Sequence, residues 1–260
     1  MPFTPSHAAL ALPFLRAPLI PSAVVIGTIG PDLPYFLPFP TFRDETHALW
    51  GVPTIDLVIG LVTWMLWIIV LRAPLVDLAP GWIRHRMPPP PALPWRGQNR
   101  ARRLALLVVA ILLGTITHLL WDAPTHPGWL ADHVEVLRVP LGALPLTSWL
   151  HYASSVAGIV ALAMWVRLWV VRTPRAEGEG CVGRGIRHLS LVAALAGFAI
   201  GGLVTWTIGI ASGHPPFEGF LVFRVARVSI GAMLGVTALV CLWWIYRERR
   251  TATTLPRTSA

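Results

Sequence analysis

Five long runs of apolar residues dominate the sequence, and polar or proline-rich connections separate them. Each run has about the 20 residues that a helix needs to cross roughly 30 Å of hydrocarbon. Backbone groups in lipid must find their hydrogen-bond partners within the segment, so each run predicts a membrane-spanning helix. The predicted spans cover residues 52–71, 104–121, 149–171, 189–212 and 228–246.

The first thirty residues are also apolar, but Pro13, Pro18 and Pro21 divide them into two pieces. Each piece has about ten residues, or about 15 Å of helix, which is too short to cross a bilayer alone. Proline also lacks a backbone donor and disfavours helix in the residue before it. The pattern favours a helical hairpin or re-entrant pair with Arg16 at its tip, and a single kinked spanning helix is the alternative.

The rest of the sequence predicts no additional domain and no β-structure. The sequence contains no internal repeat and no strand pattern, and the connections at 72–103 and 172–187 are too short to form domains. We therefore predict an all-α, polytopic helical membrane protein with five spanning helices and an N-terminal proline-broken helical hairpin. Residues 1–250 would form a single helical membrane domain, and residues 251–260 a disordered cytoplasmic tail.

Composition supports the membrane assignment. Of 260 residues, 55% are hydrophobic and only 13% are charged, and the mean hydropathy is +0.63. Soluble domains carry about 25% charged residues and disordered chains are poor in apolar ones, so both classes are excluded. The two cysteines, Cys181 and Cys241, lie far apart, which excludes a disulfide framework and a thiolate metal cluster.

The net charge of +9 comes from 21 basic residues, all of them arginine. Such a charge is typical of nucleic-acid-binding proteins, but here the arginines follow the loops. Seven lie in residues 72–103, four in 172–187 and four in the tail, and alternating spans place these segments on one face of the cell membrane. The positive-inside rule makes that face cytoplasmic, and membrane lipids rather than nucleic acid are the expected partners. Arg224 and Arg227 fall on the other face and count against this assignment.

Histidines and acids gather on the face opposite the arginines. Seven of nine histidines and eight of twelve acidic residues lie at the extracytoplasmic ends of predicted elements or in the loops there. Imidazole and carboxylate groups without thiols are the ligand set of zinc and other divalent metals. The sequence therefore predicts a divalent metal, with zinc favoured, on the extracytoplasmic face.

The sharpest constellation is THLLWDAPTHPGW, residues 117–129. His118 and Asp122 are four residues apart, which places them on the same helix face, about 6 Å from each other. Ionisable residues at the end of a membrane helix are costly and mark functional sites. Both are therefore candidate metal ligands, and an interfacial cap that faces water is the alternative. His126 follows Pro124, which ends or kinks the helix, so its direction stays open.

Two further segments could complete a site on the same face. GPDLPYFLP ends the predicted hairpin with Asp32, and DETHALWG places His47 just before a span. The hairpin would also bring His7 near Asp32, because both lie at its open end. Each has a simpler alternative: Asp32 as a turn residue beside proline, and His7 as part of an N-terminal helix capped by Ser6.

These motifs carry a resemblance to a known family. MPFTPSHAALALP, IGPDLPYF, THALWG, HLLWDAPTHPGW and LHYASSVAG, in this order, resemble an uncharacterised bacterial integral membrane family, domain of unknown function 4184, over most of the chain. More distantly, an N-terminal His, a Pro-Asp, a second His and an H-x-x-x-D make the chain similar to membrane-bound metal-dependent hydrolases. The resemblance implies the metal ligands His7, Asp32, His47, His118 and Asp122.

The sequence thus favours a metal-dependent hydrolase that acts on a lipid or phosphoester at the extracytoplasmic membrane surface. His126 or Asp132 would transfer protons, and nothing in the sequence decides between them. Two alternatives stay open. One is a non-catalytic membrane scaffold whose polar cluster stabilises helix ends, and the other is a small transporter that uses Asp56, His118 and Asp122.

Overall fold

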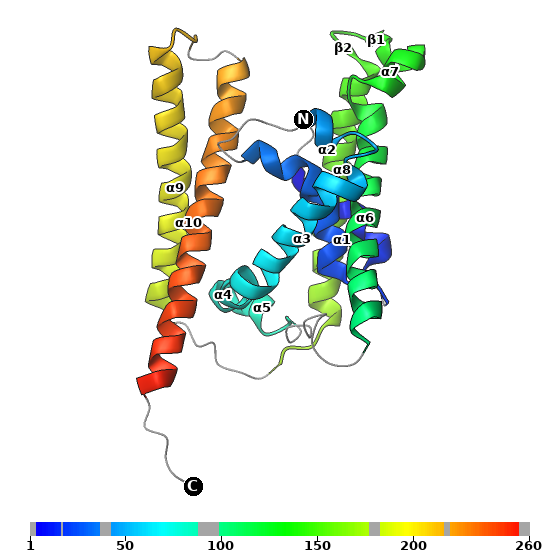
Figure 1. The fold of residues 1–260 in the computed structure, drawn as a ribbon. Coiled ribbons are helices and arrows are strands. Elements are labelled where there is room, and N and C mark those ends of the chain that lie inside the picture. The colour runs from blue at the N-terminus through cyan, green and yellow to red at the C-terminus, as the bar shows by residue number, and fades with distance from the viewer. Residues whose placement is uncertain are drawn as a thin grey trace. The chain divides into compact units, whose positions relative to one another are not determined.

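The computed structural model describes residues 4–16, 18–36, 43–87, 99–176, 183–215 and 219–254. Most of these residues are helical. The only strands among them are the two-residue β1 (Pro140–Leu141) and β2 (Leu144–Pro145), which pair antiparallel. The protein is therefore all-α, as predicted (Figure 1).

Within the described part of the chain, five helical stretches are long and apolar enough to cross a membrane: Val52–Leu78, Arg100–Thr125, Leu146–Arg172, Gly185–Ala211 and Arg224–Tyr246. Each coincides with one predicted span, and most extend beyond it, because an apolar run marks only the lipid-facing part of a helix. The first span extends furthest: the sequence predicts its end at residue 71, but the helix continues through Pro74 to Leu78. A π-helical turn, η4 (Trp67–Leu71), precedes this proline, and such local adjustments let membrane helices continue through proline.

The chain divides into two compact units. The first comprises Met1–Pro34, Thr41–Trp64 and Pro91–Pro174, and the second comprises Tyr35–Pro40, Met65–Pro90 and Arg175–Ala260. Every candidate metal ligand belongs to the first unit. A single domain over residues 1–250 stays a prediction, and residues 255–260 of the expected tail lie outside the described residues.

The N-terminal hairpin of the first unit is built from two different helices. η1 (Thr4–Phe14) is a 3-10 helix that contains Pro13. α1 (Pro21–Ile29) begins with proline, which the first turn of a helix tolerates because its N–H groups have no helical partner. The two helices pack against each other, with Arg16 in the connection. The predicted hairpin is confirmed.

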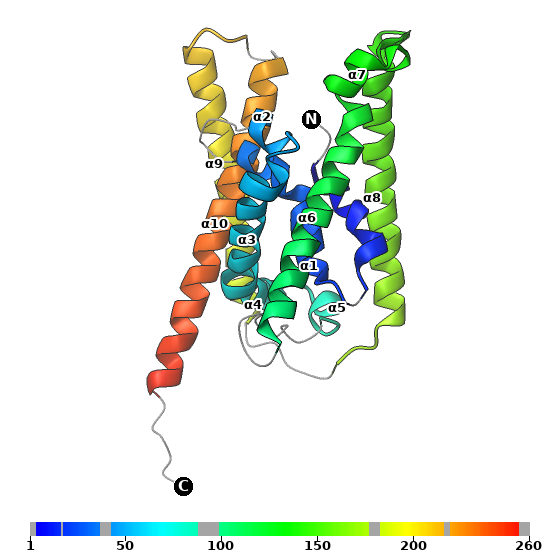
Figure 2. The same ribbon diagram turned by 45° about the vertical axis from the view of Figure 1, so that its right-hand side comes forward.

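The hairpin lies between two long helices, α6 (Arg100–Thr125) and α8 (Leu146–Arg172) (Figure 2). α1 packs on α6, while η1 packs on α1 and α8. Gly27 of α1 and Gly114 of α6 let the two backbones meet, since a Cβ on either would clash with a carbonyl oxygen of the other helix. This contact fixes the end of α1 beside the C-terminal half of α6.

The first span begins next to these helices. α2 (Arg43–Thr46) precedes a π-helical turn, η3 (Val52–Asp56), which contacts both α2 and α6. α3 (Leu57–Leu66) continues the span, and the Trp64 indole N–H donates to Ser22 Oγ at 3.1 Å. The connection from α6 to α8 contains α7 (Trp129–His133) and η5 (Glu135–Arg138).

The second unit is dominated by α9 (Arg184–Ala211) and α10 (Gly219–Thr254), which lie side by side in both ribbon views (Figures 1 and 2). Three glycines of α9 face residues of α10 and allow close approach in the way that small residues do between membrane helices. They are Gly197, Gly201 and Gly202. The unit also contains η4, α4 (Arg72–Leu78) and α5 (Gly81–Arg84).

Arg227, which the predicted topology places on the less basic face, has a specific partner within the second unit. Its Nε–H donates to the Tyr35 carbonyl oxygen, and its guanidinium carbon lies 5.0 Å from the centre of the Tyr35 ring. Charge-assisted hydrogen bonds and cation–π contacts stabilise an arginine in such surroundings. Its position therefore has a local explanation and does not require a reversed topology.

Candidate metal centre

Helix α6 carries two candidate ligands on its buried face. His118 and Asp122 lie one turn apart, with relative exposures of 0% and 6%. Gly114 and Thr115, on the same face, contact α1. The i, i+4 spacing therefore places His118 and Asp122 on the same face of α6 that packs against α1. Both side chains lie near the end of α1.

Asp32 and His47 reach the same place from two other elements. Asp32 stands in η2 (Gly30–Phe36), the 3-10 helix that follows α1, and is 1% exposed. His47 directly follows α2, and its Nδ1 lies 3.0 Å from Thr46 Oγ1. With 12% of its side chain exposed, His47 is more accessible than Asp32. Three separate segments thus supply four side chains.

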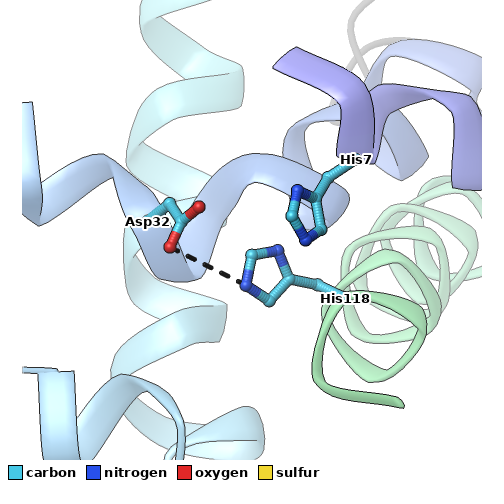
Figure 3. A group of neighbouring side chains, drawn as sticks. All are labelled: His7, Asp32 and His118. Carbon is cyan, nitrogen blue, oxygen red and sulfur yellow. Dashed lines mark ion pairs between the residues drawn. The ribbon is translucent and has the colours of Figure 1, made fainter. Parts of the chain in front are cut away.

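Four ligand atoms of these residues converge. His47 Nε2 lies 3.4 Å from His118 Nε2, 3.7 Å from Asp32 Oδ1 and 3.6 Å from Asp122 Oδ2. His118 Nε2 lies 3.8 Å from Asp32 Oδ1 and 3.6 Å from Asp122 Oδ2. Figure 3 shows Asp32 and His118 facing each other, with His7 beside them.

These distances are short enough for neighbouring atoms to bind one metal ion. The ligand atoms of His47, His118 and Asp122 lie 3.4 to 3.6 Å from one another. Two ligands bound at about 2.0–2.2 Å and at the tetrahedral angle would lie about 3.3–3.6 Å apart. These three residues could therefore hold a metal ion, and Asp32 Oδ1 lies 3.7 and 3.8 Å from the two imidazole nitrogens.

Hydrogen bonds hold the outward-facing atoms of the same side chains. His118 Nδ1–H donates to the Thr28 carbonyl oxygen at 2.8 Å, and Thr4 Oγ1 donates to Asp32 Oδ2 at 2.7 Å. The inward-facing atoms are farther from one another than in an ordinary hydrogen bond of about 2.7–3.2 Å. Outer atoms bonded to the protein and inner atoms directed at a common centre are typical of metal ligands.

A protein-family model, described as a domain of unknown function (DUF4184), matches residues 1–248. The chain belongs to the DUF4184 family. The match covers all five spans and every candidate ligand, so the cluster lies within the family domain. No curated protein and no solved structure matches the chain. The DUF4184 description names no activity, and the likeness to metal-dependent hydrolases stays a prediction.

In this DUF4184 protein, the fifth predicted ligand, His7, lies against the other four. Its Nε2 is 2.9 Å from Asp122 Oδ1, and its ring stacks on that of His118 with centroids 4.3 Å apart. Among the residues that the structure describes, two groups of three could hold an ion, and the ligand atoms of each lie within 4.8 Å of one another: His7, Asp32 and His118, and His47, His118 and Asp122. The structure thus brings all five residues into one cluster.

Of the two residues predicted for proton transfer, His126 lies beside the cluster and Asp132 does not. His126 Nδ1 lies 3.6 Å from Asp122 Oδ1, and its ring centre lies 5.1 Å from that of His151. Burial lowers the pKa of His126 to about 4, although the Asp122 charge acts in the opposite direction. Asp132 is exposed on α7, and its carboxylate makes no hydrogen bond or ion pair with the described residues.

Sequence patterns single out only one of the residues that orient the ligands. Thr46 adjoins His47, so their contact could be expected from the sequence. Thr4 and Thr28 stand 28 and 90 residues from their partners. Only the packing of η1 and α1 brings these two threonines to the cluster, and that packing has no local signature.

Proposed function

We propose that this DUF4184 protein is a metal-dependent hydrolase that acts on a lipid or phosphoester at the extracytoplasmic face of the membrane. The observation that carries the proposal is the convergence of His47 Nε2 and His118 Nε2, which lie 3.4 Å from each other and 3.6 to 3.8 Å from one oxygen each of Asp32 and Asp122. Two neutral imidazoles and two carboxylates carry two negative charges. A divalent cation balances these charges, which removes the cost of burying them.

A divalent ion held there supplies Lewis acidity toward a phosphoryl or acyl oxygen and lowers the pKa of a water molecule at the site. The chain's own residues orient the ligands. The Thr28 carbonyl oxygen accepts a hydrogen bond from His118 Nδ1–H, so the proton stays on Nδ1 and His118 Nε2 presents its lone pair to the centre. Thr4 occupies one oxygen of Asp32 and leaves the other directed inward.

His126 is the residue best placed to move a proton beside this cluster. Its Nδ1 lies 2.9 Å from Thr125 Oγ1 and 3.3 Å from the Asp122 carbonyl oxygen, which can only accept. The Thr125 hydroxyl donates to the carbonyl oxygens of Trp121 and Asp122, so His126 Nδ1 carries the proton. Nε2 keeps its lone pair and is buried without a hydrogen-bond partner among the described residues. We assign proton transfer to it, ahead of the exposed Asp132.

A membrane-bound substrate suits the position of the cluster. Its α6 ligands lie in the last turns of the span Arg100–Thr125, where a helix that crosses about 30 Å of hydrocarbon would reach the lipid head groups. His47, with 12% of its side chain exposed, marks the side from which a substrate would approach. The arginine distribution supports an extracytoplasmic location for this end.

Metal content of the full-length protein tests the proposal. The protein is purified in detergent, and zinc, manganese and iron are measured per chain by plasma mass spectrometry. We expect about one ion per chain, and loss of more than about nine-tenths of it in His118→Ala/Asp122→Ala, because two of four ligands are removed. His133→Ala is the matched control, since His133 stacks on Trp129 and is exposed on α7. Absence of a stoichiometric ion, or its full retention in the double variant, overturns the proposal.

Hydrolysis is measured separately on metal-loaded protein. The substrates are mixed micelles of phosphatidylethanolamine and phosphatidylglycerol, and bis-p-nitrophenyl phosphate. We expect turnover that the double variant loses, and that His126→Ala lowers by about 10²–10⁴-fold with its ion retained. Bound metal without turnover of any of these substrates would instead favour a non-catalytic scaffold.

One observation favours a second candidate function, cation transport. Asp56 lies inside the span Val52–Leu78, is 1% exposed, and neither carboxylate oxygen has a hydrogen-bond partner among the described residues. Ionisable residues at such positions mark ion pathways in many membrane proteins. Cation flux into proteoliposomes that Asp56→Asn abolishes, with metal content unchanged, would support transport. Equal flux in both proteins would reject it.

A further inference from the structure

The 3-10 helix η1 contacts both carboxylates of the candidate metal centre. Thr4 Oγ1 donates to Asp32 Oδ2 at 2.7 Å, and His7 Nε2 lies 2.9 Å from Asp122 Oδ1. In each carboxylate the other oxygen, Asp32 Oδ1 or Asp122 Oδ2, faces the two converging imidazoles. One short helix thus engages the outer oxygen of both acidic ligands.

We propose that Thr4 and His7 are positioning residues of the metal centre, and that ion binding and the docking of η1 stabilise each other. The inference rests on the proposed metal-binding function of the cluster. It goes further by giving His7 the role of a hydrogen-bond donor to Asp122 and by making the N-terminal helix part of the site.

The geometry of His7 is that of a donor. A carboxylate oxygen only accepts, so the 2.9 Å contact with Asp122 places a proton on His7 Nε2, and a protonated nitrogen has no lone pair for a cation. The His7 ring stacks on His118 at an interplanar angle of 27°, so it covers a ligand. His7 Nδ1, which then carries only a lone pair, is buried without a partner among the described residues. An unpaired acceptor is better tolerated there than an unpaired N–H.

η1 depends on tertiary contacts because its own conformation is weak. 3-10 helices longer than about four residues are uncommon, and this one has eleven residues and contains Pro13. It packs on α1 and α8, where a Cβ on Gly158 would lie 3.0 Å from Ser6 Cβ. The hydrogen bonds of Thr4 and His7 add polar anchors toward the metal centre. An ion that fixes both carboxylates strengthens these anchors, and by linkage the docked anchors strengthen ion binding by the same factor.

Matched substitutions separate hydrogen bonding from metal ligation. Thr4→Val and His7→Ala each remove a donor, and each should lower zinc affinity by about 10–100-fold. Thr4→Ser keeps the hydroxyl and His7→Gln keeps an N–H that can reach Asp122, so both should stay within about threefold of the wild type. The affinities are measured on the full-length protein in detergent by competition with a chromophoric chelator.

Hydrogen exchange gives a readout independent of affinity and activity. Zinc should slow amide exchange in residues 4–14 of the wild type by at least about fivefold, because local opening of η1 then also costs ion binding. Thr4→Val and His7→Ala should lose this protection, and Thr4→Ser and His7→Gln should keep it. α9, which has no candidate ligand, is the internal control and should not respond.

Several outcomes would overturn the inference. If His7→Gln loses zinc as strongly as His7→Ala, or if the wild type holds two ions and His7→Gln one, His7 is a ligand. If Thr4→Val and His7→Ala change neither affinity nor exchange, η1 does not position the site. A wild type that binds no zinc removes the proposed metal function together with this inference. Zinc binding that is indifferent to all four variants removes the inference alone.

Discussion

Helices α6 and α9 have similar lengths and are both apolar enough to cross the membrane, yet they are held in different ways. α9 packs on α10 through three glycines. α6 uses the same device at Gly114 against α1, but one turn later it buries His118, and then Asp122. The first helix ends in a polar contact network, whereas the second is held by close packing.

The difference separates packing from binding within one kind of scaffold. Close approach of small residues is sufficient to hold two helices together in lipid. Burying an imidazole and a carboxylate is costly unless they are paired or bind a cation. The polar stripe of α6, which we define as Thr115, His118 and Asp122, carries two of the candidate metal ligands, whereas α9 carries none of them. Matched substitutions on the two helices can test this difference.

The largest effect should come from Gly114→Val. The added Cβ would clash with the Val24 carbonyl oxygen and lie 2.8 Å from Thr28 N, and backbone atoms cannot turn aside as a side chain can. We expect a loss of about 3 kcal/mol or more in the free energy of unfolding. Bound metal should be lost too, because α1 carries Thr28 and leads directly to Asp32. Thermal unfolding and metal analysis measure both, and an ion retained in Gly114→Val would show that the α1–α6 contact does not position the cluster.

Removal of the ion should affect the two helices unequally. A ligand that binds only the folded state stabilises it by about 2.7 kcal/mol at 100 times its Kd. Chelation should therefore lower the thermal midpoint and speed amide exchange in the C-terminal half of α6, with exchange in α9 unchanged. An equal response of both helices would mean that the ion stabilises the whole chain. A midpoint that does not move would contradict any structural contribution of the ion.

The spans and the hairpin could be predicted from the sequence because their causes are local. An apolar run of span length has few options in lipid, and the predicted run 104–121 lies inside α6. Pro13, Pro18 and Pro21 act on their own neighbours, so the break in the N-terminal segment is visible in the residues themselves. The helical spacing of His118 and Asp122 is local in the same sense.

The convergence of the remaining candidates depends on packing that no local pattern reveals. Asp32 reaches His118 only because α1 meets α6 at a pair of glycines. His126 and Asp132 both follow Asp122 closely in the sequence, but α6 ends at Thr125 and the chain then turns into α7. Only His126 stays beside Asp122, and Asp132 is exposed. The choice between these two could therefore not be made from spacing.

Gly201→Val tests the packing side of the comparison. Its Cβ would lie 2.7 Å from Ala232 Cβ and 3.2 Å from the Val228 carbonyl oxygen, so α9 and α10 must separate slightly. We expect a loss of about 1–3 kcal/mol in the free energy of unfolding, with the metal content of the wild type. Loss of the ion in Gly201→Val would mean that the glycine contacts of α9 also support the metal centre.

A smaller difference should appear with pH. Burial lowers the pKa of His126, at the end of α6, from 6.5 to about 4. Between these values the unfolded chain binds more protons than the folded one, so protonation of His126 favours unfolding. The free energy of unfolding is therefore highest above about pH 6.5 and decreases as the pH falls toward 4. The thermal midpoint of the metal-free protein should rise with pH across this window, and His126→Gln should reduce the slope. An unchanged slope would assign the pH dependence to other groups.

The smallest effect is expected at Thr115, which stands on the polar stripe of α6 but faces the packing contact with α1. Its hydroxyl donates to the Gly27 carbonyl oxygen at 3.5 Å, near the limit for a hydrogen bond. Thr115→Val keeps the branched shape, so the free energy of unfolding should change by less than about 0.5 kcal/mol and zinc affinity by less than about twofold. Thermal unfolding and chelator competition measure the two quantities. If Thr115→Val lowered zinc affinity as strongly as Thr4→Val is expected to, binding would depend on the whole polar stripe. The boundary between packing and binding on α6 would then lie one turn nearer its N-terminus.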